Sequence, residues 1–177
     1  MASLAIDTGV MVEAGGARLH AGWNRAAPQT APALEPVVFL PGLLCDQALW
    51  RRQIHALADT AAPMVADLTL DDTIGAMAER TLAAAPSRFS LVGLSMGGYV
   101  ALEIMRRAPE RVSRLALINS SARSDTPERT EQRRVAIESL QRGKFLGITH
   151  KLLGQLVHPD HTVGAVADEM RGMASRV

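Results

Sequence analysis

Short runs of apolar residues alternate along this chain with longer segments in which apolar residues recur every three or four positions. The short runs predict buried β-strands, because a strand that is covered on both faces needs no polar face. The longer segments predict amphipathic helices. The predicted buried strands are Val37–Leu40, Met64–Ala66, Phe89–Leu94 and Arg114–Asn119.

Helices are predicted between these strands. Asp46 is a plausible N-cap for a helix that carries Trp50, Ile54 and Leu57 at helical spacing. Two further helices run from about Asp72 to before Pro86 and over Met96–Arg107. This alternation predicts the α/β class, with a mostly parallel sheet between helices on both faces.

The two ends of the chain differ from this pattern. Near the N-terminus, Val10–Glu13 and Arg18–Trp23 flank Gly15-Gly16 and predict a β-hairpin. After Asn119 the pattern is helical only, and Asp125 or Thr126 before Pro127 is expected to start the first of these helices. The predicted helices are about Glu128–Gln141, Phe145–Val157 and Val163–Ala174.

Composition narrows the class of protein. The chain has 177 residues, of which 47% are hydrophobic, and a formal net charge of +1. It is long enough to bury a core, and its charge does not favour a nucleic-acid partner. Cys45 is the sole cysteine, so no intrachain disulfide can form. No basic leader and no apolar run of membrane-spanning length is seen, and we expect a cytoplasmic protein without a membrane partner.

The pentapeptide Gly93-Leu94-Ser95-Met96-Gly97 carries the main chemical signal. A Gly-x-Ser-x-Gly turn between a strand and a helix exposes and aims a serine nucleophile. The bare pattern should occur by chance in roughly one chain of this length in twenty, so its strand–turn–helix context carries the argument. The alternative is a turn that binds phosphate at a helix N-terminus. No GxxxxGK[ST] or GxGxxG sequence supports that alternative.

An oxyanion hole needs backbone N–H groups in fixed positions. We expect one from Met96, which follows the nucleophile, and one from Leu43, in the loop that begins with Pro41-Gly42. Both Ser95 and this loop follow the carboxyl ends of predicted parallel strands, where ligands bind in such sheets. The alternative is that Pro41-Gly42 only ends a strand.

In order, spacing and context, the first 122 or so residues resemble the α/β-hydrolase superfamily. The segments that carry the resemblance are VVFLPGLLCDQALW, FSLVGLSMGGYVALEIM and RLALINSSAR. It is nearest in character to the cofactor-independent carboxylesterases, enol-lactonases and C–C bond hydrolases. The resemblance implies a core over residues 1–122, an incomplete helical cap over 123–177, the oxyanion roles of Leu43 and Met96, and no cofactor.

The resemblance also implies a catalytic acid and a histidine on loops that follow the cap. The chain carries no predicted strand after Ile118 to hold them, so it looks like the N-terminal two-thirds of a hydrolase. His158 and His161, with Asp160 between them, are the best substitutes for a base within the chain, and a polar connecting loop is the alternative. No HxxxH, HExxH or CxxC pair predicts a metal site.

Together these observations predict a serine hydrolase for a small ester, lactone or related carbonyl substrate, very weakly active or inactive as this chain alone. The alternative is a non-catalytic protein that binds a ligand or partner on the same fold. Acyl transfer and C–C cleavage use the same motifs and also stay open. A sheet that ends at the predicted strand Arg114–Asn119 leaves an unpaired edge, through which we expect self-association.

Overall fold

The computed structural model describes residues 13–14, 17–18, 33–143 and 148–177. The chain forms two units, Met1–Ala33 and Leu34–Val177. In the first unit, β1 (Glu13–Ala14) pairs antiparallel with β2 (Ala17–Arg18). This pairing agrees with the predicted hairpin, whose Gly15-Gly16 turn and outer residues lie outside the described part of the chain.

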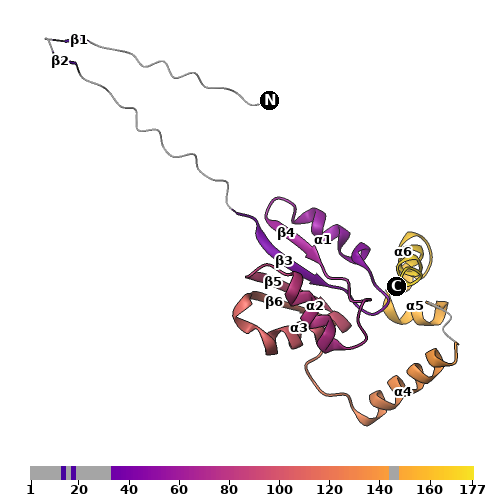
Figure 1. Cartoon of the computed structure of the whole chain (residues 1–177). Coiled ribbons are helices and arrows are strands. Elements are labelled where there is room, and N and C mark those ends of the chain that lie inside the picture. The colour runs from indigo at the N-terminus through magenta and orange to yellow at the C-terminus, as the bar shows by residue number, and fades with distance from the viewer. Residues whose placement is uncertain (1–12, 15–16, 19–32, 144–147) are drawn as a thin grey trace. The chain divides into compact units, whose positions relative to one another are not determined.

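A four-stranded parallel sheet forms the centre of the second unit (Figure 1). The order of its strands is β4-β3-β5-β6, and each neighbouring pair is parallel. This arrangement confirms the predicted α/β class. The bounds of the strands are β3 Glu35–Leu40, β4 Ala61–Val65, β5 Phe89–Leu94 and β6 Val112–Ile118.

Alternating side chains of β3 enter two separate apolar clusters. Val38 and Leu40 belong to a cluster that includes side chains of α2 (Ile74–Ala84) and α3 (Met96–Arg107). Val37 and Phe39 belong to the other cluster, with Trp50 at the end of η1 (Gln47–Trp50). Because successive strand residues point to opposite faces, helices must cover both faces, as the apolar runs predicted.

The helices begin where local capping predicts. The Asp46 side chain accepts a hydrogen bond from the Ala48 amide at 2.8 Å, and the chain continues from η1 into α1 (Arg51–Ala56). The helix predicted from about Asp72 begins at Ile74, where Thr73 accepts a hydrogen bond from the Ala76 amide at 3.2 Å. After α3, the short η2 (Pro109–Arg111) leads into β6.

The prediction that the strand Arg114–Asn119 is buried is wrong. The strand forms, but Arg114 to Ile118 are all exposed, including Leu115 and Leu117 at 39% each and Ile118 at 42%. The reason is position: β6 is last in the sheet order and pairs with β5 alone among the described strands. An apolar run predicts that a strand can be buried, but only its neighbours decide whether it is.

The residues after β6 are helical, as predicted. They form α4 (Pro127–Gln141), α5 (His150–Leu156), η3 (Pro159–His161) and α6 (Ala165–Ala174). The helix predicted over Phe145–Val157 is seen as α5, and residues 144–147 lie outside the described part. Side chains of this region, Ile148, Leu153, Ala167 and Ala174, form a third apolar cluster.

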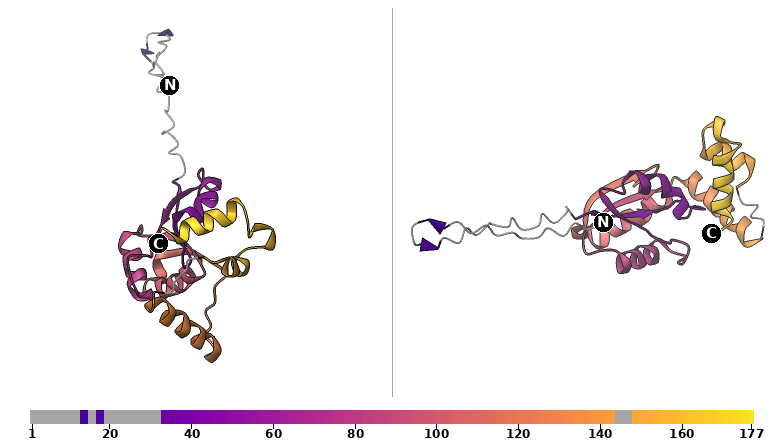
Figure 2. Two further views of the ribbon diagram at one scale, coloured as in Figure 1. Left: turned by 90° about the vertical axis from the view of Figure 1, so that its right-hand side faces the viewer. Right: turned by 90° about the horizontal axis from the view of Figure 1, so that it is seen from above.

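Helix α6 crosses the side of the molecule at which the strands end (Figures 1 and 2). Helix α4 extends away from the sheet in the same views. The Arg134 side chain of α4 pairs with Glu131 and Glu138 of the same helix. Helix α6 therefore lies on the side of the sheet where the carboxyl ends of the strands meet and a ligand site is expected.

Candidate active site

Ser95 lies on the turn between β5 and α3 with φ 51° and ψ −112°. A non-glycine residue in this region is strained and persists only where its surroundings hold it. The Ser95 amide donates to the Ile118 carbonyl at 3.0 Å. The Ser95 carbonyl accepts from the Gly98 amide at 3.0 Å and from the Ser120 hydroxyl at 2.9 Å. The sharp turn predicted from the pentapeptide is therefore present, and both the amide and the carbonyl of Ser95 are held by hydrogen bonds.

The glycines of the pentapeptide are required by close backbone approach. A Cβ at Gly93 would lie 2.5 Å from the Gly97 carbonyl oxygen. A Cβ at Gly97 would lie 2.6 Å from the Pro41 carbonyl oxygen at the end of β3. Since backbone atoms cannot move aside as a flexible side chain can, only glycine fits at either position.

The loop after β3 contacts the serine turn directly. A Cβ at Gly42 would lie 3.5 Å from Cβ of Ser95 and 3.6 Å from the Leu94 carbonyl oxygen. The Cys45 amide donates to the Gly42 carbonyl at 3.1 Å and closes a tight turn with Leu43 and Leu44 at its centre. The two segments that were expected to form an oxyanion hole thus lie beside each other.

The two residues predicted to supply the oxyanion amides take different positions. Leu43 lines the pocket in front of Ser95, with its side chain 68% exposed. Met96 is the first residue of α3, and its partly buried side chain packs against the core cluster on the α2 and α3 face. The roles of their N–H groups stay predictions.

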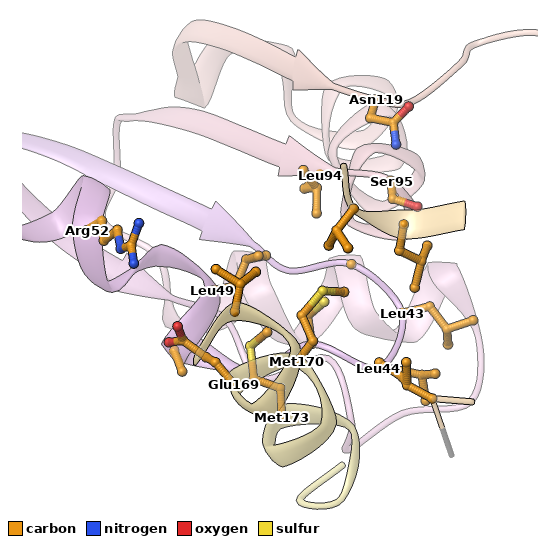
Figure 3. Close-up of a pocket in the computed structure, with 17 residues that line it drawn as sticks. Leu43, Leu44, Leu49, Arg52, Leu94, Ser95, Asn119, Glu169, Met170 and Met173 are labelled. Carbon is orange, nitrogen blue, oxygen red and sulfur yellow. The ribbon is translucent and has the colours of Figure 1, made fainter. Parts of the chain in front are cut away.

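A pocket of about 400 Å³ opens in front of Ser95 (Figure 3). Its wall is mostly apolar and is formed by residues of the loop after β3, the Ser95 turn and the C-terminal helices. A pocket of this kind, with a few convergent polar groups, is typical of a small-molecule site. The apolar side chains that line it include Leu44, Leu49, Leu94, Val157, Met170 and Met173.

Charged groups gather at one side of this pocket. Arg52 of α1 and Glu169 of α6 both line it, and Figure 3 shows them together, across the pocket from Leu43. The Glu169 carboxylate pairs with the guanidinium of the neighbouring Arg51. A second ion pair between the same regions joins Arg176 Nε to Asp46 Oδ2 at 2.6 Å. Two ion pairs therefore connect the C-terminal helical region to the segment that follows the Gly42 turn.

Cys45 also lines the pocket, and its side chain is partly buried. Burial raises the pKa of the Cys45 thiol above its usual value, and the negative charge of Asp46 adds to this effect. A reactive cysteine needs the opposite shift, because the thiolate is the nucleophile. Ser95 is thus the better candidate nucleophile in this pocket.

The histidines do not meet Ser95 within the described residues. The His158 side chain is 68% exposed, and its Nδ1 lies 3.5 Å from Oδ2 of Asp160. Neither His158 nor His161 is among the residues that line the pocket. The alternative of a polar connecting loop fits their positions better than the alternative of a substitute base.

Three residues have site positions that the sequence did not predict. Asn119, with φ 45°, lines the pocket, and Ser120 holds the Ser95 carbonyl. Glu169 reaches the pocket from α6. Asn119-Ser120 directly follows the carboxyl end of β6, and that place in the strand order was the available signal. Nothing in the local sequence marks Glu169.

Asp125 ion-pairs instead of capping a helix. Its carboxylate lies 2.6 Å from Arg133 Nε, and Thr126 accepts the hydrogen bond from the Arg129 amide at the start of α4.

Within the described residues, no group of three histidine, cysteine, aspartate or glutamate side chains is placed to hold a metal ion. No helix of the described part is long and apolar enough to cross a membrane.

This chain has an α/β-hydrolase fold. It combines a parallel sheet that has helices on both faces, a strained serine between β5 and α3, and a pocket at the strand ends. Solved structures support this assignment. An esterase from Thermogutta terrifontis is 26% identical, with a TM-score of 0.61 over 79% of this chain and 57% of its own. The enol-lactonase from Burkholderia xenovorans LB400 is 22% identical, with a TM-score of 0.55 over 81% of this chain and 64% of its own.

Est816, an N-acyl homoserine lactone degrading enzyme, is 21% identical, with a TM-score of 0.58 over 80% of this chain and 57% of its own. The chain therefore spans less than two thirds of the length of these structures. No protein-family model matches the chain. A comparison with curated protein sequences also gave no match.

Proposed function

We propose that this chain carries the nucleophile and the oxyanion hole of a serine hydrolase for a small ester, lactone or related carbonyl substrate. Ser95 attacks the carbonyl carbon, and the Leu43 and Met96 amides stabilise the oxyanion that forms. The observation that carries the proposal is the strained Ser95 turn beside the Gly42–Cys45 turn, at the base of a largely apolar pocket. The neighbouring esterase and lactonase structures agree with this class of substrate.

Deprotonation of Ser95 requires a base beside its hydroxyl. A serine hydroxyl at its ordinary pKa is a weak nucleophile and needs a partner. Since the pocket is lined by no histidine among the described residues, we propose that the histidine and acid of the triad come from outside this chain. The chain alone should then have very low activity. The C-terminal helical region, residues 123–177, acts as the cap that shapes the acyl pocket.

Hydrolysis of p-nitrophenyl acetate tests this assignment, with Ser95→Ala as the comparison and Ser124→Ala, at an exposed serine, as the control. We expect slow turnover that Ser95→Ala abolishes and Ser124→Ala leaves unchanged. Turnover that is fast and depends on Ser95 would show that a base is present in the chain. Turnover that survives Ser95→Ala would contradict the role of Ser95 itself.

A non-catalytic binding protein is the second candidate, and the same absence of a pocket histidine among the described residues favours it. Reaction with a fluorophosphonate, followed by intact-mass measurement, separates the two, because this reagent requires an activated serine. A mass increase that Ser95→Ala removes supports the hydrolase, and it should form slowly because no histidine among the described residues lines the pocket. Ligand binding without any such increase supports the binding protein.

A further inference from the structure

Leu44 has a backbone conformation that its side chain does not favour. Its φ is 61°, in the left-handed region, at the third position of the turn closed by the Cys45 amide and the Gly42 carbonyl. A turn with positive φ at this position normally has glycine there. For a non-glycine residue the left-handed region is disfavoured about 5- to 30-fold. Something beyond the turn must therefore hold Leu44.

The side chain of Leu44 packs against the third apolar cluster, which belongs to the C-terminal helical region. The buried members of this cluster that lie in helices are Leu153 of α5, and Ala167 and Ala174 of α6. Leu153 is fully buried. Leu44 is thus the point at which a residue of the loop after β3 enters the apolar core of the helices.

This contact matters because Leu43, the residue before Leu44, carries the proposed oxyanion donor. The Leu43 N–H, which is the proposed oxyanion donor, belongs to the Gly42–Leu43 peptide, and the next peptide, which joins Leu43 to Leu44, lies in the centre of the turn. If residue 44 left the left-handed region, the Leu43–Leu44 peptide would rotate or the turn would open, and Leu43, at the second position of the same turn, would no longer be held in place. An oxyanion donor acts only if it is fixed before charge develops.

We propose that Leu44 is a positioning residue that couples the C-terminal helices to the oxyanion turn. With the helices packed, the apolar cluster holds the Leu44 side chain, and the turn presents the Leu43 amide to the pocket. With the helices loosened, residue 44 returns to a favoured conformation and the turn no longer fixes the Leu43 amide. The catalytic meaning of this coupling rests on the proposed function, whereas the coupling itself does not.

Backbone chemical shifts of residue 44 in the full chain test the coupling without any activity. We expect left-handed shifts in the unchanged chain and in Leu44→Met, which keeps the packing. We expect them to be lost in Leu44→Ala and in Leu153→Ala. Val163→Ala, at a residue 70% exposed in the same region, is the control and should leave them unchanged. Left-handed shifts that persist in both Leu44→Ala and Leu153→Ala would overturn the proposal.

The rate of fluorophosphonate reaction at Ser95 gives a second readout that packing alone would not produce. We expect Leu44→Ala to react about 5- to 30-fold more slowly than the unchanged chain, and Leu44→Gly to be slowed less, because glycine accepts positive φ without cost. A purely structural role predicts the opposite order, since glycine removes more side chain and adds backbone freedom. That order would also overturn the proposal.

The two proposals fail in distinguishable ways. If Ser95 does not react in any variant, the proposed hydrolase function lacks support, and the shifts of residue 44 alone decide the coupling. If Ser95 reacts but residue 44 keeps its conformation when α5 is perturbed by Leu153→Ala, the function stands and the coupling is wrong.

Discussion

At the scale of single residues, the site depends on contacts that leave no room for a Cβ. Gly97 shows this most clearly, because its nearest neighbours are backbone atoms of Leu40 and Pro41 at the end of β3. Gly154, in the interior of α5, offers a contrast, since no atom would lie within 4 Å of a Cβ there. A side chain is therefore excluded at Gly97 and has room at Gly154.

We therefore expect Gly97→Ala to lower the free energy of unfolding by about 3 kcal/mol, at the upper end of the usual cost of overpacking. Gly154→Ala should be neutral or raise it by up to about 1 kcal/mol, because alanine favours a helix over glycine. Urea unfolding followed by circular dichroism measures both. Equal changes in the two variants would contradict the close approach of α3 to β3.

At the scale of elements, the last turn of α3 carries a compact ionic group. Glu103 accepts hydrogen bonds from Arg106 at 2.7 Å and from Arg107 at 2.6 Å. These two arginines lower the pKa of Glu103 from 4.5 to about 2. Because the folded pKa is the lower one, the stabilisation is complete above pH 4.5 and is lost as the pH falls toward 2.

Replacement of Glu103 by glutamine should therefore make the melting temperature less dependent on pH between about 4.5 and 2. Near pH 7 the variant should be slightly less stable than the unchanged chain, and the difference should shrink in acid. Melting curves at several pH values measure this. Glu110→Gln is the control, because the structure gives Glu110 no ion pair among the described residues.

Two ion pairs also join separate elements. Arg51 of α1 pairs with Glu169 of α6, and Asp46, at the start of η1, pairs with Arg176, which follows α6. Arg176 also lowers the pKa of Asp46 through its hydrogen bond. Exposed pairs contribute about 0–1 kcal/mol each and weaken with salt. Their effect should be local to the C-terminal helices.

We expect the double variant Asp46→Asn/Glu169→Gln to be cut faster than the unchanged chain by a protease within residues 148–177 at low salt. High salt should remove most of that difference. The double variant Glu131→Gln/Glu138→Gln serves as the control, because it removes ion pairs within α4 and one to Arg142 directly after it. A difference that persists at high salt would show that the pairs do not act by charge.

At the scale of the whole molecule, the described sheet ends on one side in β6, an outer strand with exposed apolar side chains. Leu115 and Leu117 on β6 are each 39% exposed beside a strand edge that is unpaired within the described residues. An apolar, unpaired edge is a template for pairing with another chain. We propose that copies of this chain associate through β6.

Light scattering should then show mass that rises with protein concentration. Leu117→Lys should reduce this association, because a lysine on an edge strand opposes pairing. Leu70→Lys is the matched control, since Leu70 is 60% exposed and lies in the loop after β4. A monodisperse monomer at all concentrations would contradict the proposal.

The strand–turn–helix around Ser95 was readable from the sequence because all of its causes are local. The apolar run of β5, the spaced glycines and the periodicity of α3 lie within Phe89–Arg107, and each has a direct physical meaning. The Asp46 cap of η1 was predicted for the same reason, and the helix predicted from about Asp72 begins at Ile74. The parallel sheet followed from the alternation of these elements.

What only the tertiary structure decided are the contacts between segments far apart in the chain. The exposure of β6 depends on which strands lie beside it, and an apolar run does not carry that information. The left-handed conformation of Leu44 contradicts its local preference, and its side chain packs against the third apolar cluster, whose members lie more than a hundred positions away. Glu169 reaches the pocket because α6 crosses the strand ends. The sequence by itself determined the aimed serine, and tertiary packing decided the walls of its pocket and the turn that faces it.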